Sequence, residues 1–169
     1  MTDYDALYQN TPNALGPQDP GVGACLLRLP APPLRILDFG AGQGRDALPL
    51  ARQGHAVTAI DPAPSGLKQI AGIAEAEQLD ITCQVGTAKD VAGEYDVLLS
   101  NRTLHMILDD GERHTTLTRL LSHLAPGGHV LIEDERSNIP GLRNVMGQNG
   151  NWDWLEETPA RLFARRKTG

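Results

Sequence analysis

Short apolar runs along the chain, each closed by a turn residue, predict a series of buried strands. Five such runs precede the C-terminal region, at residues 34–39, 56–60, 81–85, 96–99 and 129–134. Helical patterns fill most of the intervals between them, and strands that alternate with helices in this way form right-handed crossovers and a parallel sheet. The pattern therefore predicts a doubly wound α/β fold with helices on both faces of the sheet.

Three helices are expected between these strands. The first covers residues 46–53, with a bend or frayed first turn at Pro49 because proline cannot donate a backbone hydrogen bond. The other two are indicated by apolar residues three and four positions apart, namely Leu67, Ile70, Ala71 and Ala74, and then Leu117, Leu120, Leu121 and Leu124. Residues 126–128, Pro-Gly-Gly, should end the last helix and lead into the strand at 129–134.

Beyond residue 134 the alternation of strands and helices ends. Two short apolar stretches, 152–155 and 160–164, flank a polar segment that contains Pro159 and favour a tight hairpin. The interval 137–151 is short and rich in glycine, so any helix within it is expected to be brief or irregular.

Composition and charge narrow the class of protein. The chain has 169 residues, 40% of them apolar, which suits one core and predicts a single domain, 1–169, with residues 1–33 as an N-terminal cap or lid segment. No apolar run approaches the roughly 20 residues that span a bilayer, and residues 1–23 lack the features of a secretion signal. We therefore expect a cytoplasmic protein, and the net charge of −6 disfavours a nucleic-acid partner.

The potential metal ligands show no spacing typical of a metal site. These residues are His55, His114, His123 and His129, with Cys25 and Cys83. We expect no bound metal, and both cysteines are expected to be buried free thiols. The sequence leaves the oligomeric state open.

Three glycines at every second position follow the first predicted strand, in the segment Ile36-Leu37-Asp38-Phe39-Gly40-Ala41-Gly42-Gln43-Gly44. Glycine lets the backbone approach a ligand closely and turn sharply into the next helix. Asp61 lies 21 residues beyond Gly40, at the end of the second predicted strand, where a carboxylate suits two ribose hydroxyls. The two features together favour a ligand that contains a nucleoside.

A nicotinamide or flavin dinucleotide is the rival ligand. Its fingerprint requires G-x-G-x-x-G so that a pyrophosphate can lie at the helix N-terminus, but Arg45 stands where the third glycine is needed. Asp38 would also repel a dinucleotide, whereas it would tolerate the cationic amine of S-adenosylmethionine (SAM). SAM has no pyrophosphate and does not require that third glycine.

These segments, together with Tyr95–Leu99 and the Leu-Ala-Pro-Gly-Gly turn at 124–128, resemble the ordered motifs of class I SAM-dependent methyltransferases. The resemblance implies a Rossmann-like seven-stranded sheet, mostly parallel, that ends in a C-terminal antiparallel hairpin. More narrowly, residues 42–48 are similar to the small methyltransferases of the tellurite-resistance type. In the family, an acidic residue often follows the third strand and contacts adenine, whereas Thr87 stands there in this chain.

The resemblance implies cofactor contacts from the glycine turn, the second strand end, the loop after the third strand and the fourth strand end. The expected cofactor-binding residues are Asp38, Gly40, Ala41, Gly42, Gly44, Asp61, Pro62, Thr87, Ala88 and Asn101.

Candidates for the acceptor side lie where the fourth and fifth strands end, because open sheets bind ligands at the carboxyl ends of their strands. His105 and Arg102 are the catalytic candidates, while Arg136 and the N-terminal Tyr8 are the substrate candidates. The bland alternatives are a packed histidine, solvated arginines and a disordered tail. No carboxylate is evident in the sequence to orient the His105 imidazole, so we expect His105→Gln to slow catalysis less than about tenfold.

Three functions remain open from the sequence. A methyltransferase that acts on a small molecule is favoured, because the chain adds little to the core fold that could grip a macromolecule. A protein or RNA methyltransferase and a non-catalytic SAM-binding regulatory protein are the alternatives.

Overall fold

The computed structural model describes residues 2–169. These residues form two compact units, which divide between Thr87 and Ala88. No helix among them is long and apolar enough to cross a membrane. The single domain, 1–169, with residues 1–33 as a cap or lid, stays a prediction.

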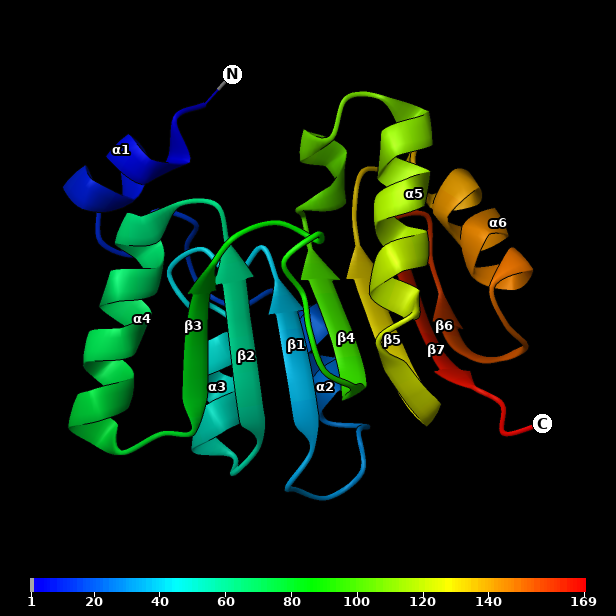
Figure 1. The fold of residues 1–169 in the computed structure, drawn as a ribbon, viewed down its shortest axis with the longest axis horizontal. Coiled ribbons are helices and arrows are strands. Elements are labelled where there is room, and N and C mark those ends of the chain that lie inside the picture. Colours follow the sequence, from blue (N-terminus) through cyan, green and yellow to red (C-terminus); the bar gives the residue numbers. More distant parts are fainter. Residues whose placement is uncertain (1) are drawn as a thin grey trace. The chain divides into compact units, whose positions relative to one another are not determined.

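The first unit is built on three parallel strands, which lie in the order β3-β2-β1. They are β1 (Arg35–Phe39), β2 (Ala56–Asp61) and β3 (Ile81–Val85) (Figure 1). Four of the five residues of β1 are buried, as expected of a parallel strand covered on both faces. The register places the ends of neighbouring strands together, because Phe39 pairs with Ile60 and Asp61 pairs with Val85.

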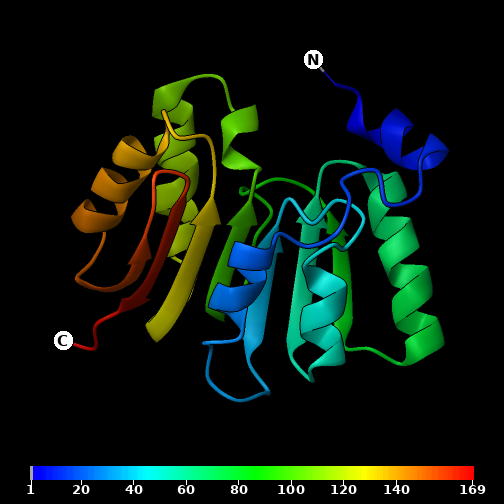
Figure 2. The same ribbon diagram turned by 180° about the vertical axis from the view of Figure 1, so that it is seen from behind.

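Four helices belong to this unit: α1 (Tyr4–Asn10), α2 (Pro20–Leu26), α3 (Ala47–Arg52) and α4 (Pro64–Glu77). Figure 2 shows α2 and α3 lying against one face of its strands. Two aspartates begin the N-terminal helices, since Asp3 accepts from the Ala6 amide at 3.0 Å and Asp19 accepts from the Val22 amide at 2.9 Å. The alternative of a disordered N-terminal tail is therefore wrong.

The second unit contains four strands in the order β4-β5-β7-β6. They are β4 (Tyr95–Asn101), β5 (Leu124–Glu133), β6 (Trp152–Glu157) and β7 (Arg161–Arg166). β4 and β5 are parallel, whereas β7 runs antiparallel to both β5 and β6. Its helical elements are the short 3₁₀ helix η1 (Leu104–Met106), α5 (Asp110–Leu121) and α6 (Ile139–Gln148).

The predicted fold class is confirmed. The seven strands, three in the first unit and four in the second, are mostly parallel and end in the antiparallel hairpin expected near residues 152–164. Helices α3, α4 and α5 follow β1, β2 and β4, as the alternating pattern predicted, whereas residues 86–94 lead from β3 to β4 without a helix.

Two details of the predicted helices are wrong. Leu124 is not the end of a helix, because the Tyr95 amide donates to the His123 carbonyl at 2.8 Å and Leu124 pairs with Tyr95 to begin β5. Pairing with the neighbouring strand here outweighs the helical spacing of the leucines. Ala71 is exposed on α4, while Gly66 joins the buried face of that helix.

The segment before the hairpin also differs from the prediction. It holds a regular helix, α6, of ten residues rather than a brief or irregular one. Leu142 and Met146 are completely buried, and the indole of Trp152 donates to the Met146 carbonyl at 2.7 Å. This packing stabilises a helix that the local glycine content disfavours.

Candidate functional site

The turn after β1 has backbone angles that favour glycine at three positions. Gly40, Gly42 and Gly44 have φ values of 80°, 54° and 86°, in the left-handed region where other residues are strained. The amides of Gly40 and Ala41 both donate to the Ile60 carbonyl, at 2.8 and 3.1 Å. The turn is therefore anchored to the end of β2, next to Asp61.

Asp61 holds this turn from the end of β2. One carboxylate oxygen accepts from the Gly42 amide at 2.9 Å and the other accepts from the Ala63 amide at 2.8 Å. Burial raises the pKa of Asp61, although these two amides oppose the shift. Because a carboxylate can accept about four hydrogen bonds, the side chain retains capacity for two ribose hydroxyls.

Asp38 lies in β1, just before the turn, and is 2% exposed. Within residues 2–169, its Oδ2 atom has no hydrogen-bond partner. Burial, followed by repulsion from Asp46 and Asp61, raises the pKa of Asp38 well above its ordinary value. A buried acceptor without a partner is unusual, and a cationic amine would supply both the missing donor and the missing charge.

Gly66 in α4 was missed by the sequence analysis. A Cβ atom at this position would lie 2.2 Å from the Gly42 carbonyl oxygen, so only glycine permits this approach of α4 to the turn. A glycine inside a segment of helix-forming residues was the signal that could have revealed it.

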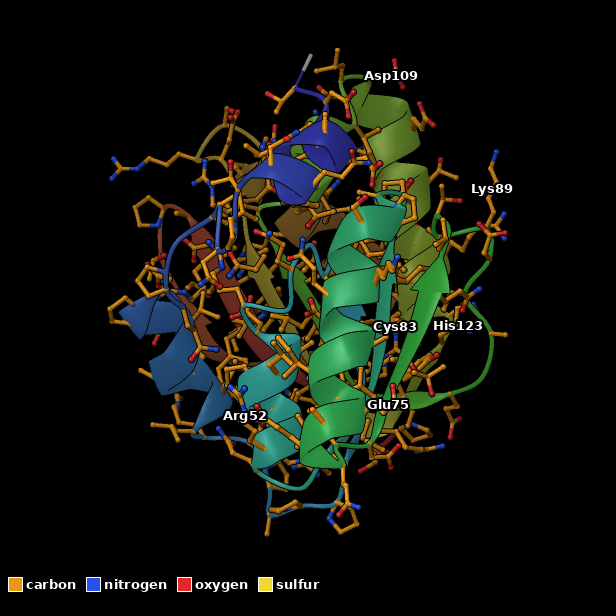
Figure 3. The ribbon with its side chains drawn as sticks, turned by 90° about the vertical axis from the view of Figure 1, so that its left-hand side faces the viewer. Arg52, Glu75, Cys83, Lys89, Asp109 and His123 are labelled. Atoms are coloured by element: carbon orange, nitrogen blue, oxygen red, sulfur yellow. The ribbon has the colours of Figure 1, made fainter. Side chains whose placement is uncertain are left out.

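The N-terminal segment packs on the same turn. The Gln43 side chain donates to the Thr11 carbonyl at 2.9 Å and accepts from the Ala14 amide at 2.8 Å. The Asp5 carboxylate accepts from the Ser65 amide at 2.8 Å, which caps α4 because its own N-cap residue, Ala63, makes no side-chain bond. Figure 3 shows α1 lying across the end of α4.

Tyr8, predicted to contact substrate, is buried against this turn. Its hydroxyl would lie 2.9 Å from a Cβ atom placed on Gly42. Burial, and then the charge of Asp61, raise the pKa of Tyr8 to about 12. Tyr8 thus lies with the predicted cofactor residues, and its contact with a substrate stays a prediction.

The remaining cofactor candidates are divided between the two units. Pro62 and Thr87 are exposed in the first unit, and the Gly86 amide donates to the Asp61 carbonyl at 3.1 Å. Ala88 and Asn101 are buried in the second unit. Their contacts with a cofactor stay predictions.

Arg102 and Arg136 both have exposed side chains in the second unit. The backbone of Arg102 adopts a φ of 55°, and its amide donates to the Glu133 carbonyl at 2.7 Å. The backbone of Arg102 therefore forms the turn after β4. The catalytic role of Arg102 and the substrate role of Arg136 stay predictions.

His105 lies in η1 beside a carboxylate that the sequence did not reveal. The backbone amide of His105 donates to Asp134 Oδ2 at 3.0 Å, and the imidazole Nδ1 lies 4.0 Å from the same oxygen. The structure thus places a carboxylate near this imidazole, although Nδ1 makes no hydrogen bond within residues 2–169. Asp134 is 29 residues away in sequence and is brought to His105 by the pairing of β4 with β5.

The potential metal ligands and the two cysteines are also located in the structure. Residues 2–169 contain no group of three or more histidine, cysteine, aspartate or glutamate side chains that could hold a metal ion. Cys25 is buried as expected, whereas Cys83 is only partly buried.

Comparisons with known proteins agree with this geometry. Residues 36–128, from β1 into β5, match the methyltransferase domain family. The chain is 36% identical over 119 residues to a ubiquinone biosynthesis O-methyltransferase of Caulobacter sp. (strain K31), covering 68% of the chain and 46% of that protein. It is 42% identical over 144 residues to the protein of the same name from Methylocella silvestris, covering 78% of the chain and 55% of that protein.

A solved structure shares the fold. Magnesium protoporphyrin IX methyltransferase from Synechocystis, crystallised with SAM, aligns with a TM-score of 0.70 at 19% identity, over 87% of this chain and 76% of that one. The narrower resemblance to the tellurite-resistance type stays a prediction. The chain spans about half the length of the curated relatives it matches. With the glycine turn, Asp61 and the matched family in agreement, the chain belongs to the methyltransferase domain family.

Proposed function

We propose that the chain is an enzyme that binds SAM and transfers its methyl group to a small-molecule acceptor. The observation that carries the proposal is the buried Asp38 carboxylate, whose Oδ2 has no hydrogen-bond partner in residues 2–169 and which lies just before the glycine turn. The amine of SAM would provide the cation and the donor that this carboxylate requires.

The other residues of the first unit fit the remaining parts of the cofactor. Asp61 would accept the ribose hydroxyls, and the backbone of Gly40, Gly42 and Gly44 would allow the methionine part to approach closely. When bound, SAM supplies a methyl group that is activated by a sulfonium charge. The chain then has to bind and orient the acceptor, because positioning provides most of the rate in such a transfer.

The proposed acceptor atom is the oxygen of a hydroxyl group. The two relatives described above are named O-methyltransferases, and both belong to the biosynthesis of a small molecule. The protein or RNA acceptor and the non-catalytic SAM-binding role remain as alternatives. The cytoplasmic location and the absence of a nucleic-acid partner stay predictions.

Calorimetry tests the cofactor assignment. The chain should bind SAM and S-adenosylhomocysteine but not NADH, and Asp61→Ala should weaken both by about 1.5 to 3 kcal/mol for each charge-assisted bond that is lost. Asp80→Asn is the matched control, because Asp80 is an exposed aspartate of the same unit. Unchanged SAM affinity in a folded Asp61→Ala variant would remove the ribose assignment.

A second experiment tests the transfer itself. Methyl-labelled SAM is incubated with the chain and a fractionated cell extract, and label in small metabolites supports the proposed function. Label in RNA or protein would support the macromolecular alternative. Tight SAM binding with no labelled product in any fraction would favour the regulatory alternative.

A further inference from the structure

The imidazole of His105 presents an unsatisfied nitrogen to a buried carboxylate. His105 Nδ1 is buried and, among residues 2–169, makes no hydrogen bond. The Oδ2 atom of Asp134 lies 4.0 Å away. Buried side-chain nitrogens are normally hydrogen-bonded, so this pair requires an explanation.

Asp134 is rigidly held. Its side chain has no exposed surface, and its Oδ1 atom accepts from the Glu135 amide at 2.9 Å and from the Asn138 side chain at 2.7 Å. Its Oδ2 atom accepts from the His105 amide at 3.0 Å. Three donors therefore fix the direction of the carboxylate before any ligand arrives.

The backbone around His105 is fixed as well. The buried Arg113 side chain donates from Nε to the Leu104 carbonyl at 3.2 Å and from Nη2 to the Ile107 carbonyl at 2.6 Å. These carbonyls flank His105, and Leu104 itself is completely buried. A role for Asp134 in holding this turn would need only its bond to the His105 amide, and would leave the nearby Nδ1 atom unexplained.

We propose that Asp134 is a positioning residue that selects the His105 tautomer with a proton on Nδ1. In this tautomer the Nδ1–H group would face Asp134 Oδ2 across the 4.0 Å separation, and the pair would shorten to a hydrogen bond on ligand binding, since catalytic hydrogen bonds are often long in unliganded enzymes. Nε2 is then left as a free acceptor. The carboxylate orients the imidazole without itself taking up a proton.

This inference rests on the proposed function, in which the acceptor is a hydroxyl. The acceptor O–H bond breaks and its proton moves to His105 Nε2. The oxygen electron pair forms the new bond to the methyl carbon, and the electrons of the broken carbon–sulfur bond stay on sulfur. The opposite tautomer would present an N–H group to the acceptor and could not remove its proton.

Nitrogen NMR of the ligand-free protein, labelled with ¹⁵N-histidine, tests the tautomer directly. At a pH where the imidazole is neutral, long-range ¹H–¹⁵N spectra should show His105 protonated on Nδ1. In Asp134→Asn the proportion protonated on Nε2 should rise at least severalfold, whereas Glu112→Gln, which changes an exposed glutamate of the same unit, should leave the spectrum unchanged. His105→Gln assigns the signals.

The spectrum of the unsubstituted chain decides the proposal even if Asp134→Asn fails to fold. An His105 imidazole protonated on Nε2 would overturn it, and so would a folded Asp134→Asn variant with the original tautomer. SAM binding, measured separately by calorimetry, tests the proposed function, so failure of one can be distinguished from failure of the other.

Discussion

In each of two loops of this protein, a buried aspartate accepts a hydrogen bond from a backbone amide, but different kinds of residue shape the two loops. The Asp61 carboxylate accepts a hydrogen bond from the Gly42 amide in the first unit. The Asp134 carboxylate accepts one from the His105 amide in the second. The first loop is shaped by glycines with left-handed backbone angles, whereas the second is held by the Arg113 side chain. A loop made by glycines is visible in the sequence, while one made by distant side chains is not.

The difference suits the chemistry proposed for each loop. A cofactor that is the same in every member of a family can be bound by backbone groups and by carboxylates at fixed spacing. An acceptor that differs among family members has to be bound by side chains, and these are held in place by residues from separate strands. The following predictions test whether the first loop serves the cofactor and the second serves the acceptor. They begin with the largest expected effect.

The second loop should carry the larger effect on rate. His105→Gln is expected to slow single-turnover methyl transfer more than about 100-fold with SAM affinity unchanged, because a general base typically contributes about 100-fold to 10,000-fold. This expectation replaces the smaller effect predicted from sequence, because Asp134 provides the carboxylate that the sequence did not show. A loss below about tenfold would return His105 to a packing role.

The first loop should show a conflict between stability and binding at Asp38. Its folded pKa is raised above the ordinary value of 3.8, so its ionisation opposes folding and stability falls as pH rises from about 4 through the folded pKa. Asp38→Asn should flatten this decline and stabilise the ligand-free chain at neutral pH.

The same Asp38→Asn change should weaken SAM binding by about 1.5 to 3 kcal/mol, the worth of a charge-assisted bond. Urea unfolding at several pH values and calorimetry measure the two effects. A variant that is both less stable and equally good at binding SAM would contradict the assignment of Asp38 to the cofactor amine.

Substituting two glycines of α4, one against the first loop and one away from it, tests how closely this helix packs on the loop. Gly66→Ala should destabilise the chain by about 1 to 3 kcal/mol, because the added carbon meets backbone that cannot easily move. Gly72→Ala should instead stabilise it by about 0.5 to 1 kcal/mol, since nothing lies within 4 Å of the added carbon and alanine favours the helix. Equal urea midpoints for the two variants would show that α4 does not press on the turn.

The smallest expected effect concerns the loop after β3. A neutral hydroxyl accepts more weakly from an adenine amine than a carboxylate does, so Thr87→Asp should tighten SAM binding by about 1 kcal/mol. Thr87 is exposed, which allows the substitution without repacking. Weaker binding, measured by calorimetry, would indicate that this loop does not place residue 87 at the adenine.

The sequence by itself determined the parts that depend on local spacing. Alternating apolar runs indicated the doubly wound fold and its hairpin, and the glycines after β1 with Asp61 after β2 indicated the cofactor turn. These features are readable because a left-handed backbone angle demands glycine at that very position, and because strand ends meet at one edge of a parallel sheet.

Only the tertiary structure decided the features that join distant residues. The start of β5 at Leu124 depends on pairing with Tyr95, and α6 depends on burial of Leu142 and Met146. The contact of Asp134 with His105 spans 29 residues and exists because β4 and β5 run side by side. Burial and strand pairing are set by the whole fold, so residue spacing along the chain could not reveal them.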